Sequence, residues 1–116
     1  MPIVIQKEKE SYCLWLSLHK NFPKVERFGL GNKIEQTFID ILELTFSSSY
    51  LAPEHKIILL NKTISRLDVL KFFTQLAWEN KLVSSEKYAD LSARLEEIGR
   101  MLGGWRKGLQ NKTPAR

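Results

Sequence analysis

Two histidines and one pair of adjacent glutamates are the side chains that could support acid–base chemistry or hold a metal. His19 and His55 lie far apart, and neither has a partner at the spacing of a metal site. The Glu-x-x-His pair that marks di-iron helical bundles is absent as well. Glu96 and Glu97 diverge by about 100° on a helix, so they do not face each other. We therefore predict no metal, no cofactor and no small-molecule substrate.

The cysteine and the glycines add no catalytic pattern. Cys13 lies in an apolar stretch, and we expect it to be a buried small hydrophobe rather than a nucleophile. The glycines at 29–31 and 103–104 lack the preceding strand that phosphate-binding loops need. Helical RNases of the HEPN type place an arginine shortly before a catalytic histidine, and positions 12–14 and 48–50 hold none. The sequence therefore predicts a protein that is not an enzyme.

The positive charge is concentrated at the C-terminal end of the chain. The net charge is +5, from 18 basic and 13 acidic residues, and all of the acidic residues precede position 98. The basic residues beyond that point are Arg100, Arg106, Lys107, Lys112 and Arg116. One interpretation is a partner that carries phosphates or carboxylates. The other is that these cations favour a helix C-terminus and aid solubility.

The elements that must position these charges are helices, because no stretch alternates with period two for long. We predict helices at about 6–21, 30–46, 53–79 and 84–108, with a frayed basic tail at 110–116. The segment between the first two is turn-like, and the alternative there is a short helical turn that begins at Pro23. Short connections make antiparallel neighbours, so residues 1–116 should form one all-α, up-down-up-down four-helix bundle. With no long uncharged apolar run, we expect a cytoplasmic protein without membrane contact.

The last helix carries the strongest periodicity. Its large apolar residues are spaced three and four apart: Tyr88, Leu91, Leu95, Ile98, Leu102, Trp105 and Leu109. This seam predicts the bundle core, although Trp105 is also considered for the oligomer contact. Gly99 and Gly103 form a smooth strip that we expect another helix to approach closely, within the bundle or across a subunit boundary.

The helix at 53–79 has an apolar face wider than one bundle core needs. Phe72 and Trp78 fall beside the main face rather than on it. Because each helix of a monomeric bundle should leave one side to solvent, this width favours burial against another subunit.

Three stretches resemble a known family. LEEIGRMLGGWRKGL (95–109), FPKVERFGLGNKI (22–34) and IDILEL (39–44) resemble Avd proteins, the accessory variability determinants of diversity-generating retroelements. These proteins group with the four-helix-bundle proteins encoded in intervening sequences of 23S ribosomal RNA genes. The resemblance implies a pentameric, barrel-like ring with no catalysis of its own. It also implies a basic surface that binds the element's reverse transcriptase and nucleic acid during mutagenic copying of template RNA into cDNA.

Under this hypothesis the binding residues are basic and fall in three groups. They are Arg100, Arg106, Lys107 and Lys112 in the last helix and tail, Lys24, Arg27 and Lys33 around the second motif, and Arg66 and Lys71 on the third helix. The chain is less basic than such a role suggests, since Gln75 and Trp78 stand where further cations would be expected.

Two other classes stay open. A bundle of the ribosomal intervening-sequence type would share the fold and the FPKVERFGLG motif without a polymerase partner. A helical RNase is the third class, and RNA turnover by the purified protein would reveal it.

Overall fold

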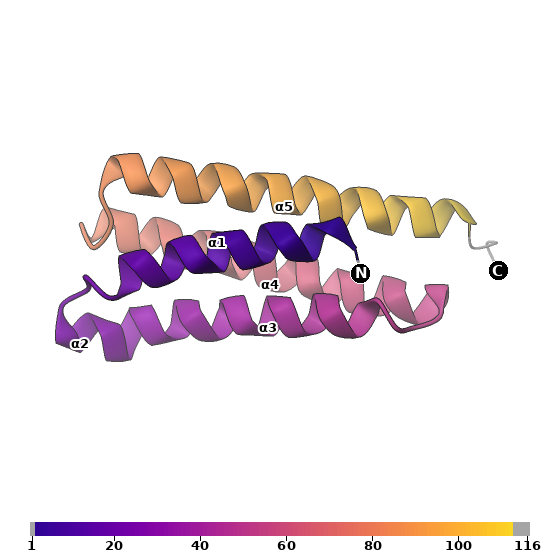
Figure 1. The fold of residues 1–116 in the computed structure, drawn as a ribbon, viewed down its shortest axis with the longest axis horizontal. Helices are drawn as coiled ribbons and strands as arrows, with labels where there is room; N and C mark the ends of the chain where they lie inside the picture. The colour runs from indigo at the N-terminus through magenta and orange to yellow at the C-terminus, as the bar shows by residue number, and fades with distance from the viewer. Residues whose placement is uncertain (1, 113–116) are drawn as a thin grey trace.

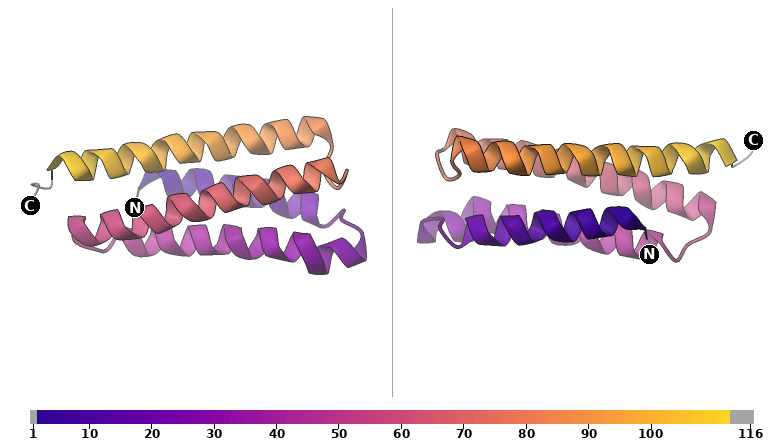
Figure 2. Two further views of the ribbon diagram at one scale, coloured as in Figure 1. Left: turned by 180° about the vertical axis from the view of Figure 1, so that it is seen from behind. Right: turned by 45° about the horizontal axis from the view of Figure 1, so that its top comes forward.

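The structure is a computed structural model that describes residues 2–112, and those residues form helices joined by short connections. Four long helices, α1 (Ile3–His19), α3 (Asn32–Ser48), α4 (Pro53–Glu79) and α5 (Ser85–Lys112), lie side by side (Figure 1). Helix α1 packs against α3 and α5, and α4 packs against the same two helices (Figure 2). Each helix runs antiparallel to the next along the chain, so the fold is an up-down-up-down four-helix bundle measuring 50 × 23 × 23 Å.

The bundle core is built from one seam on each helix. On α5 the residues Leu91, Leu95, Ile98 and Leu102 are at most 1% exposed, while Trp105 is half-buried nearer the helix end. The other helices contribute Trp15, Ile34, Phe38, Ile41, Leu60, Leu67 and Leu70. The core hydroxyls of Thr37 on α3 and Thr63 on α4 donate to the carbonyl four residues earlier, at 2.7 and 2.8 Å. These polar groups are thereby satisfied without leaving the core.

Helix α1 differs from its expected bounds at both ends. It begins at Ile3, directly after Pro2, whose extended backbone opens the helix. Val4 and Ile5 are buried there, so the apolar start of the chain belongs to the core. The helix is followed by a turn in which Phe22 N–H bonds His19 O at 3.0 Å, immediately before Pro23.

The turn-like segment contains the short helical turn that was the alternative after Pro23, and the rest of the segment is helical as well. A short helix, α2 (Lys24–Glu26), continues into a π-helical turn, η1 (Arg27–Gly31), which leads directly into α3. Gly29 has non-helical backbone angles and marks a kink between the two helical pieces. The second long helix therefore has an extra helical extension, and it ends at Ser48 rather than at about residue 46.

The last helix is longer than expected and well capped at its start. Ser84 Oγ accepts the backbone N–H of Lys87 at 3.2 Å, as an N-cap serine does. At the other end the helix continues to Lys112, so residues 110–112 belong to α5 rather than to a frayed tail. The rest of the expected tail, residues 113–116, lies outside the described residues. None of the helices among residues 2–112 contains a hydrophobic stretch of the length that spans a lipid bilayer.

One expectation about burial is wrong. Cys13 is exposed, because it lies on α1 two residues before the core residue Trp15 and points away from the seam. An apolar sequence neighbourhood did not identify the buried side, since adjacent residues of a helix diverge by about 100°.

Candidate functional site

The cations expected to bind a partner do not form one cluster. Lys24, Arg27 and Lys33 lie at the end of the bundle where α1 turns into α2 and α3 (Figure 1). Lys107 and Lys112 lie near the C-terminal end of α5, at the opposite end of a bundle 50 Å long. The structure therefore offers two separate basic regions.

The C-terminal half of α5 carries the first region. Arg100 and Lys107 are exposed and seven residues apart, which places them two turns apart on the same side of the helix. Gly104 is exposed between them, and a Cβ there would meet nothing within 4 Å. Arg106 points elsewhere, because its Nη1 donates to Asn61 Oδ1 of α4 at 3.0 Å. We call Arg100, Gly104 and Lys107 the α5 outer face.

The two cations proposed on α4 are engaged within the bundle. Lys71 Nζ lies 3.1 Å from Glu96 Oε1 of α5, so its charge is already paired. Arg66 is half-buried, and its Nε is buried with no hydrogen-bond partner among the described residues. Both side chains are therefore less available to a polyanion than the exposed cations of the α5 outer face.

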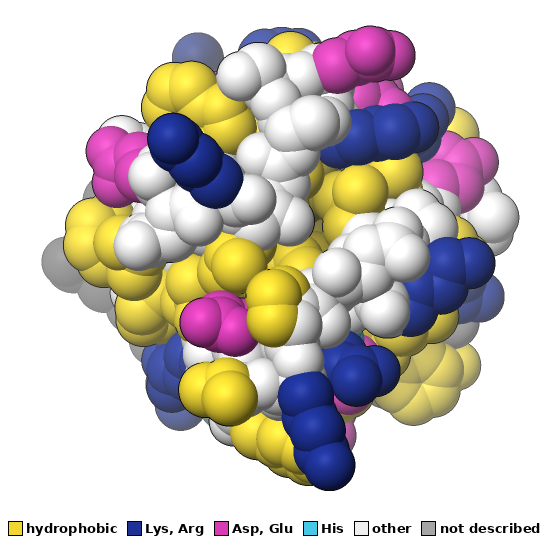
Figure 3. Space-filling view, turned by 90° about the vertical axis from the view of Figure 1, so that its left-hand side faces the viewer, with side chains coloured by type: hydrophobic (Ala, Val, Ile, Leu, Met, Phe, Trp, Pro, Cys, Tyr) yellow, Lys and Arg dark blue, Asp and Glu magenta, His cyan; other side chains and the backbone are white. Residues whose placement is uncertain are grey.

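The second basic region carries two exposed apolar side chains that the sequence reasoning missed. Val25 is 79% exposed and Phe28 is 76% exposed, beside the exposed cations Lys24 and Arg27. An end-on view of the bundle, from the side that carries α2, shows hydrophobic atoms near the centre and basic side chains among those around them (Figure 3). We call Lys24, Val25, Arg27 and Phe28 the α2 knuckle.

His19 holds the α2 knuckle in place. Its Nε2 lies 3.4 Å from Arg27 O and its Nδ1 lies 3.3 Å from Glu35 Oε1. The imidazole also stacks on Trp15, with ring centroids 4.9 Å apart. Gly31 passes so close that a Cβ there would collide with the His19 ring. His19 is thus a structural residue that joins α1 to the π turn.

A buried carboxyl group between α1 and α3 is a second feature that was missed. Glu8 is 1% exposed, and Thr45 Oγ1 donates to Glu8 Oε2 at 2.8 Å. Glu8 Oε1 is buried without a hydrogen-bond partner in the described structure. Burial raises the pKa of Glu8 to about 8, against the opposing effect of the Thr45 hydrogen bond. The signal was available, because Val4, Glu8 and Trp15 share one helical seam once α1 begins at Ile3.

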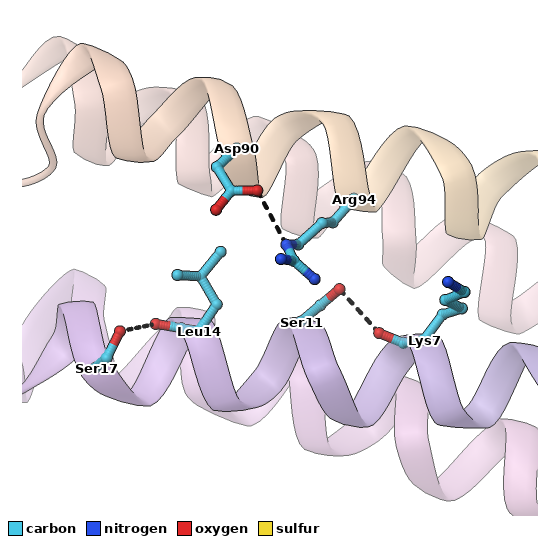
Figure 4. A network of polar contacts seen from close by, with 6 residues as sticks. All are labelled: Lys7, Ser11, Leu14, Ser17, Asp90 and Arg94. Carbon is cyan, nitrogen blue, oxygen red and sulfur yellow. Dashed lines mark hydrogen bonds and ion pairs between the residues drawn. The ribbon is translucent and has the colours of Figure 1, made fainter.

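A polar edge joins α1 to α5 along the side of the bundle. Arg94 Nε donates to Asp90 Oδ1 at 3.0 Å, and its guanidinium lies over α1 near Ser11 (Figure 4). Lys7 Nζ lies 3.7 Å from Glu97 Oε1. The Asp90–Arg94 pair lies within α5, and the Lys7–Glu97 pair joins α1 to α5; as exposed or half-buried ion pairs, both contribute little to stability. No group of three or more metal-ligating side chains occurs among the described residues.

The small and aromatic residues considered for close packing have different environments. A Cβ on Gly99 would lie 3.3 Å from Lys71 Nζ and 3.4 Å from Leu67 Cδ2, so this glycine accommodates α4 within the bundle. A Cβ on Gly103 would meet nothing within 4 Å. The Trp78 ring already has a partner within the same chain, because it stacks on Tyr88 of α5 with ring centroids 4.9 Å apart.

Phe72, by contrast, is 61% exposed on the outward side of α4. It belongs to an outward stripe with the spacing of a helical seam, formed by Ile58, Ser65, Val69, Phe72 and Leu76. Trp105 is half-buried, with Lys56 Nζ 5.8 Å from its ring centroid.

Comparison with known proteins finds a match over most of the chain. A protein-family model described as bAvd-like matches residues 3–109, a span that includes the α2 knuckle and the α5 outer face. No curated protein matches the sequence.

Proposed function

The chain belongs to the bAvd-like family, and on that premise we propose that it is a non-enzymatic accessory subunit of a diversity-generating retroelement. In this role it binds the element's reverse transcriptase and nucleic acid and supports mutagenic reverse transcription. The observation that carries the nucleic-acid part is the α5 outer face. Arg100 and Lys107 are exposed on one side of a helix that holds no acidic residue beyond Glu97.

The physical argument is counterion release. Cations that contact phosphates displace condensed counterions, which gives affinity that falls as salt rises. Two exposed cations on one helix contribute only modestly, but a homo-oligomer repeats them around its axis. The proposed assembly is a pentameric ring, as in the Avd proteins that the sequence resembles.

We expect reversal of the α5 outer face to weaken RNA binding about tenfold or more. The variant is Arg100→Glu with Lys107→Glu, and the readout is affinity for labelled single-stranded RNA across a salt series. Loss of two phosphate contacts should also reduce the slope of log affinity against log salt by about 1.4. The fold should persist, because both side chains are exposed.

The matched control is Lys9→Glu with Lys87→Glu, which changes the net charge equally on exposed positions elsewhere. If both variants lose the same RNA affinity, binding depends on net charge alone and not on the α5 outer face. Unchanged affinity in the α5 variant would contradict the proposed surface.

The polymerase partner is tested by co-purification. A reverse transcriptase encoded beside this chain, expressed together with it, should be retained on the tagged protein after nuclease treatment. Retention of ribosomal RNA without any polymerase would instead favour the intervening-sequence type of bundle. Sustained cleavage of labelled RNA would contradict a non-enzymatic role.

The subunit contact of the proposed oligomer is the outward stripe of α4. Ile58 and Phe72 are 54% and 61% exposed and lie on one side of the helix, with Ser65 midway between them. Two exposed large apolar side chains about four turns apart, with half-buried Val69 beside Phe72, are costly to leave in water and fit a second helix of the same kind. A second copy of this chain is therefore the proposed occupant.

Phe72→Glu is expected to dissociate the oligomer, because a charge placed in an apolar contact must be desolvated. Sedimentation velocity should show the mass fall to that of one chain, with helicity unchanged. Phe46→Glu is the matched control, since Phe46 is exposed on α3, outside the stripe. A Phe72→Glu protein that keeps the wild-type mass would rule out this stripe as the contact.

A further inference from the structure

The two most exposed large apolar side chains of the described chain lie together in the α2 knuckle. Val25 and Phe28 are 79% and 76% exposed, and they alternate with exposed Lys24 and Arg27. A phenylalanine ring left in water does not gain the free energy that its burial in the core would provide. The position of this ring therefore calls for an explanation beyond folding.

The π turn is what places these side chains outside the bundle. Arg27 precedes the fully buried Ile34 by seven residues, so an uninterrupted α-helix would put Arg27 on the same buried side. Phe28 likewise precedes Glu35, which is half-buried against α1 and contacts His19. The kink at Gly29 breaks this helical register, because the backbone angles of Gly29 are not helical. Arg27 and Phe28 are consequently turned towards solvent.

The turn is also fixed in this position. Arg27 O faces His19 Nε2 at 3.4 Å, and the His19 ring is held between Trp15 and Phe22 at centroid distances of 4.9 and 5.5 Å. These contacts fix the backbone that carries Phe28, so little backbone entropy is left to lose on binding. The knuckle is therefore a pre-oriented surface rather than a loose loop.

The chemistry of the surroundings distinguishes among ligands. Lys20 and Lys33 are also exposed near the same end of the bundle. Of the acids there, Glu26 is half-buried, Glu35 is paired with His19, and Glu79 is exposed at the end of α4. The core of a protein–protein contact is depleted in lysine. A flat ring among cations fits instead an unpaired base that stacks on the ring while its phosphates meet the lysines.

We propose that the α2 knuckle binds single-stranded nucleic acid, with Phe28 stacking on a base and Lys24 and Arg27 neutralising the flanking phosphates. The inference rests on the proposed nucleic-acid function and adds a second contact region, at the end of the bundle opposite the C-terminus of α5. A duplex keeps its bases stacked inside, so it can use the cations but not the ring. Preference for single strands is therefore the specific consequence.

The test compares Phe28→Leu, which keeps apolar bulk without the ring, with Phe28→Trp, which keeps a ring. The probes are a fluorescently labelled oligouridine and an RNA hairpin duplex with the same number of phosphates. Phe28→Leu should weaken binding of the single strand about tenfold and leave duplex binding unchanged. Phe28→Trp should retain single-strand affinity. Phe46→Leu, at an exposed ring on α3, is the matched control and should change neither.

The salt dependence of RNA binding distinguishes the contribution of the Phe28 ring from that of the cations Lys24 and Arg27. Phe28→Leu should lower affinity without changing the salt slope, whereas Lys24→Gln with Arg27→Gln should reduce the slope by about 1.4. Wild-type affinity in Phe28→Leu, or an equal loss on the duplex, would overturn the stacking proposal alone. Wild-type protein that binds neither probe would overturn the proposed nucleic-acid function itself. If Phe28→Leu no longer retains the reverse transcriptase but binds RNA as the wild type does, Phe28 contacts a protein. That result would also overturn the proposal.

Discussion

Glu8→Gln is expected to stabilise the fold by up to about 5 kcal/mol at pH 9 and to change it little at pH 4. Burial raises the pKa of Glu8 from 4.5 to about 8 in the folded protein, and each unit corresponds to about 1.4 kcal/mol. The folded state therefore binds a proton that the unfolded state has already released. Between pH 4.5 and 8 the unfolding free energy of the wild type should fall as pH rises.

The sign follows from the protonation of the two states. Below pH 4.5 both states hold the proton and no cost arises. Above pH 8 folding requires burial of a carboxylate whose Oε1 has no partner in the described structure. Glutamine stays neutral at every pH and can still accept the Thr45 hydrogen bond, so its contribution should not vary with pH.

The measurement is denaturant unfolding at fixed protein concentration from pH 4 to pH 9. Glu10→Gln is the matched control, because Glu10 is exposed on the same helix. Its unfolding free energy should follow the wild-type curve. Parallel curves for Glu8→Gln and wild type would show that the buried carboxyl does not govern the pH dependence.

Gly31→Ala should destabilise the protein by about 1–3 kcal/mol, the usual cost of overpacking a closed site. The added Cβ would collide with the His19 ring and lie 3.0 Å from Glu26 O. His19 cannot step aside freely, because it is stacked on Trp15 and in edge contact with Phe22. Relief would require movement of the π turn or of the core tryptophan.

A double-mutant cycle with His19→Ala isolates this collision. Because alanine at 19 removes the ring, Gly31→Ala should cost much less in that background, and the difference is the coupling between the two sites. Gly104→Ala is the control, since Gly104 is helical, exposed and open to a Cβ. It should stabilise α5 by up to about 1 kcal/mol. Equal costs of Gly31→Ala in both backgrounds would refute the close approach.

The sequence predicted the fold where one periodic signal extended over many turns. The seam of α5 identified buried residues such as Leu95 and Ile98 because every third or fourth position was large and apolar. The all-helical, four-helix fold followed from such patterns together with short connections. Family membership was likewise predicted from three motifs that lie within the matched span.

Features that depend on local irregularity or tertiary context were missed. A π turn has no distinctive composition, so the stretch that holds Gly29 and Gly31 was predicted only as turn-like. Gly29 allows the kink, and Gly31 allows the close passage past His19. Glu8 was overlooked because a glutamate is rarely buried and α1 was expected to begin after Ile3. The separation of the cations into two regions could not be predicted from charge alone, since it depends on which end of the bundle each helix terminus reaches.

The unequal lengths of α1 and α5 have a consequence for the dynamics of the C-terminal end. With 17 and 28 residues, the two helices differ by about 16 Å at 1.5 Å per residue. Near the start of α1, a hollow of about 170 Å³ lies between Ile3, Val4, Met101 and Trp105. The α5 turns beyond this hollow contact α4 through Lys56 over the Trp105 ring and through the Arg106–Asn61 hydrogen bond, and Leu109 packs against the core. Because α1 does not flank those turns, we expect them to open before the rest of α5, and a polyanion that binds Lys107 would restrict this local unfolding.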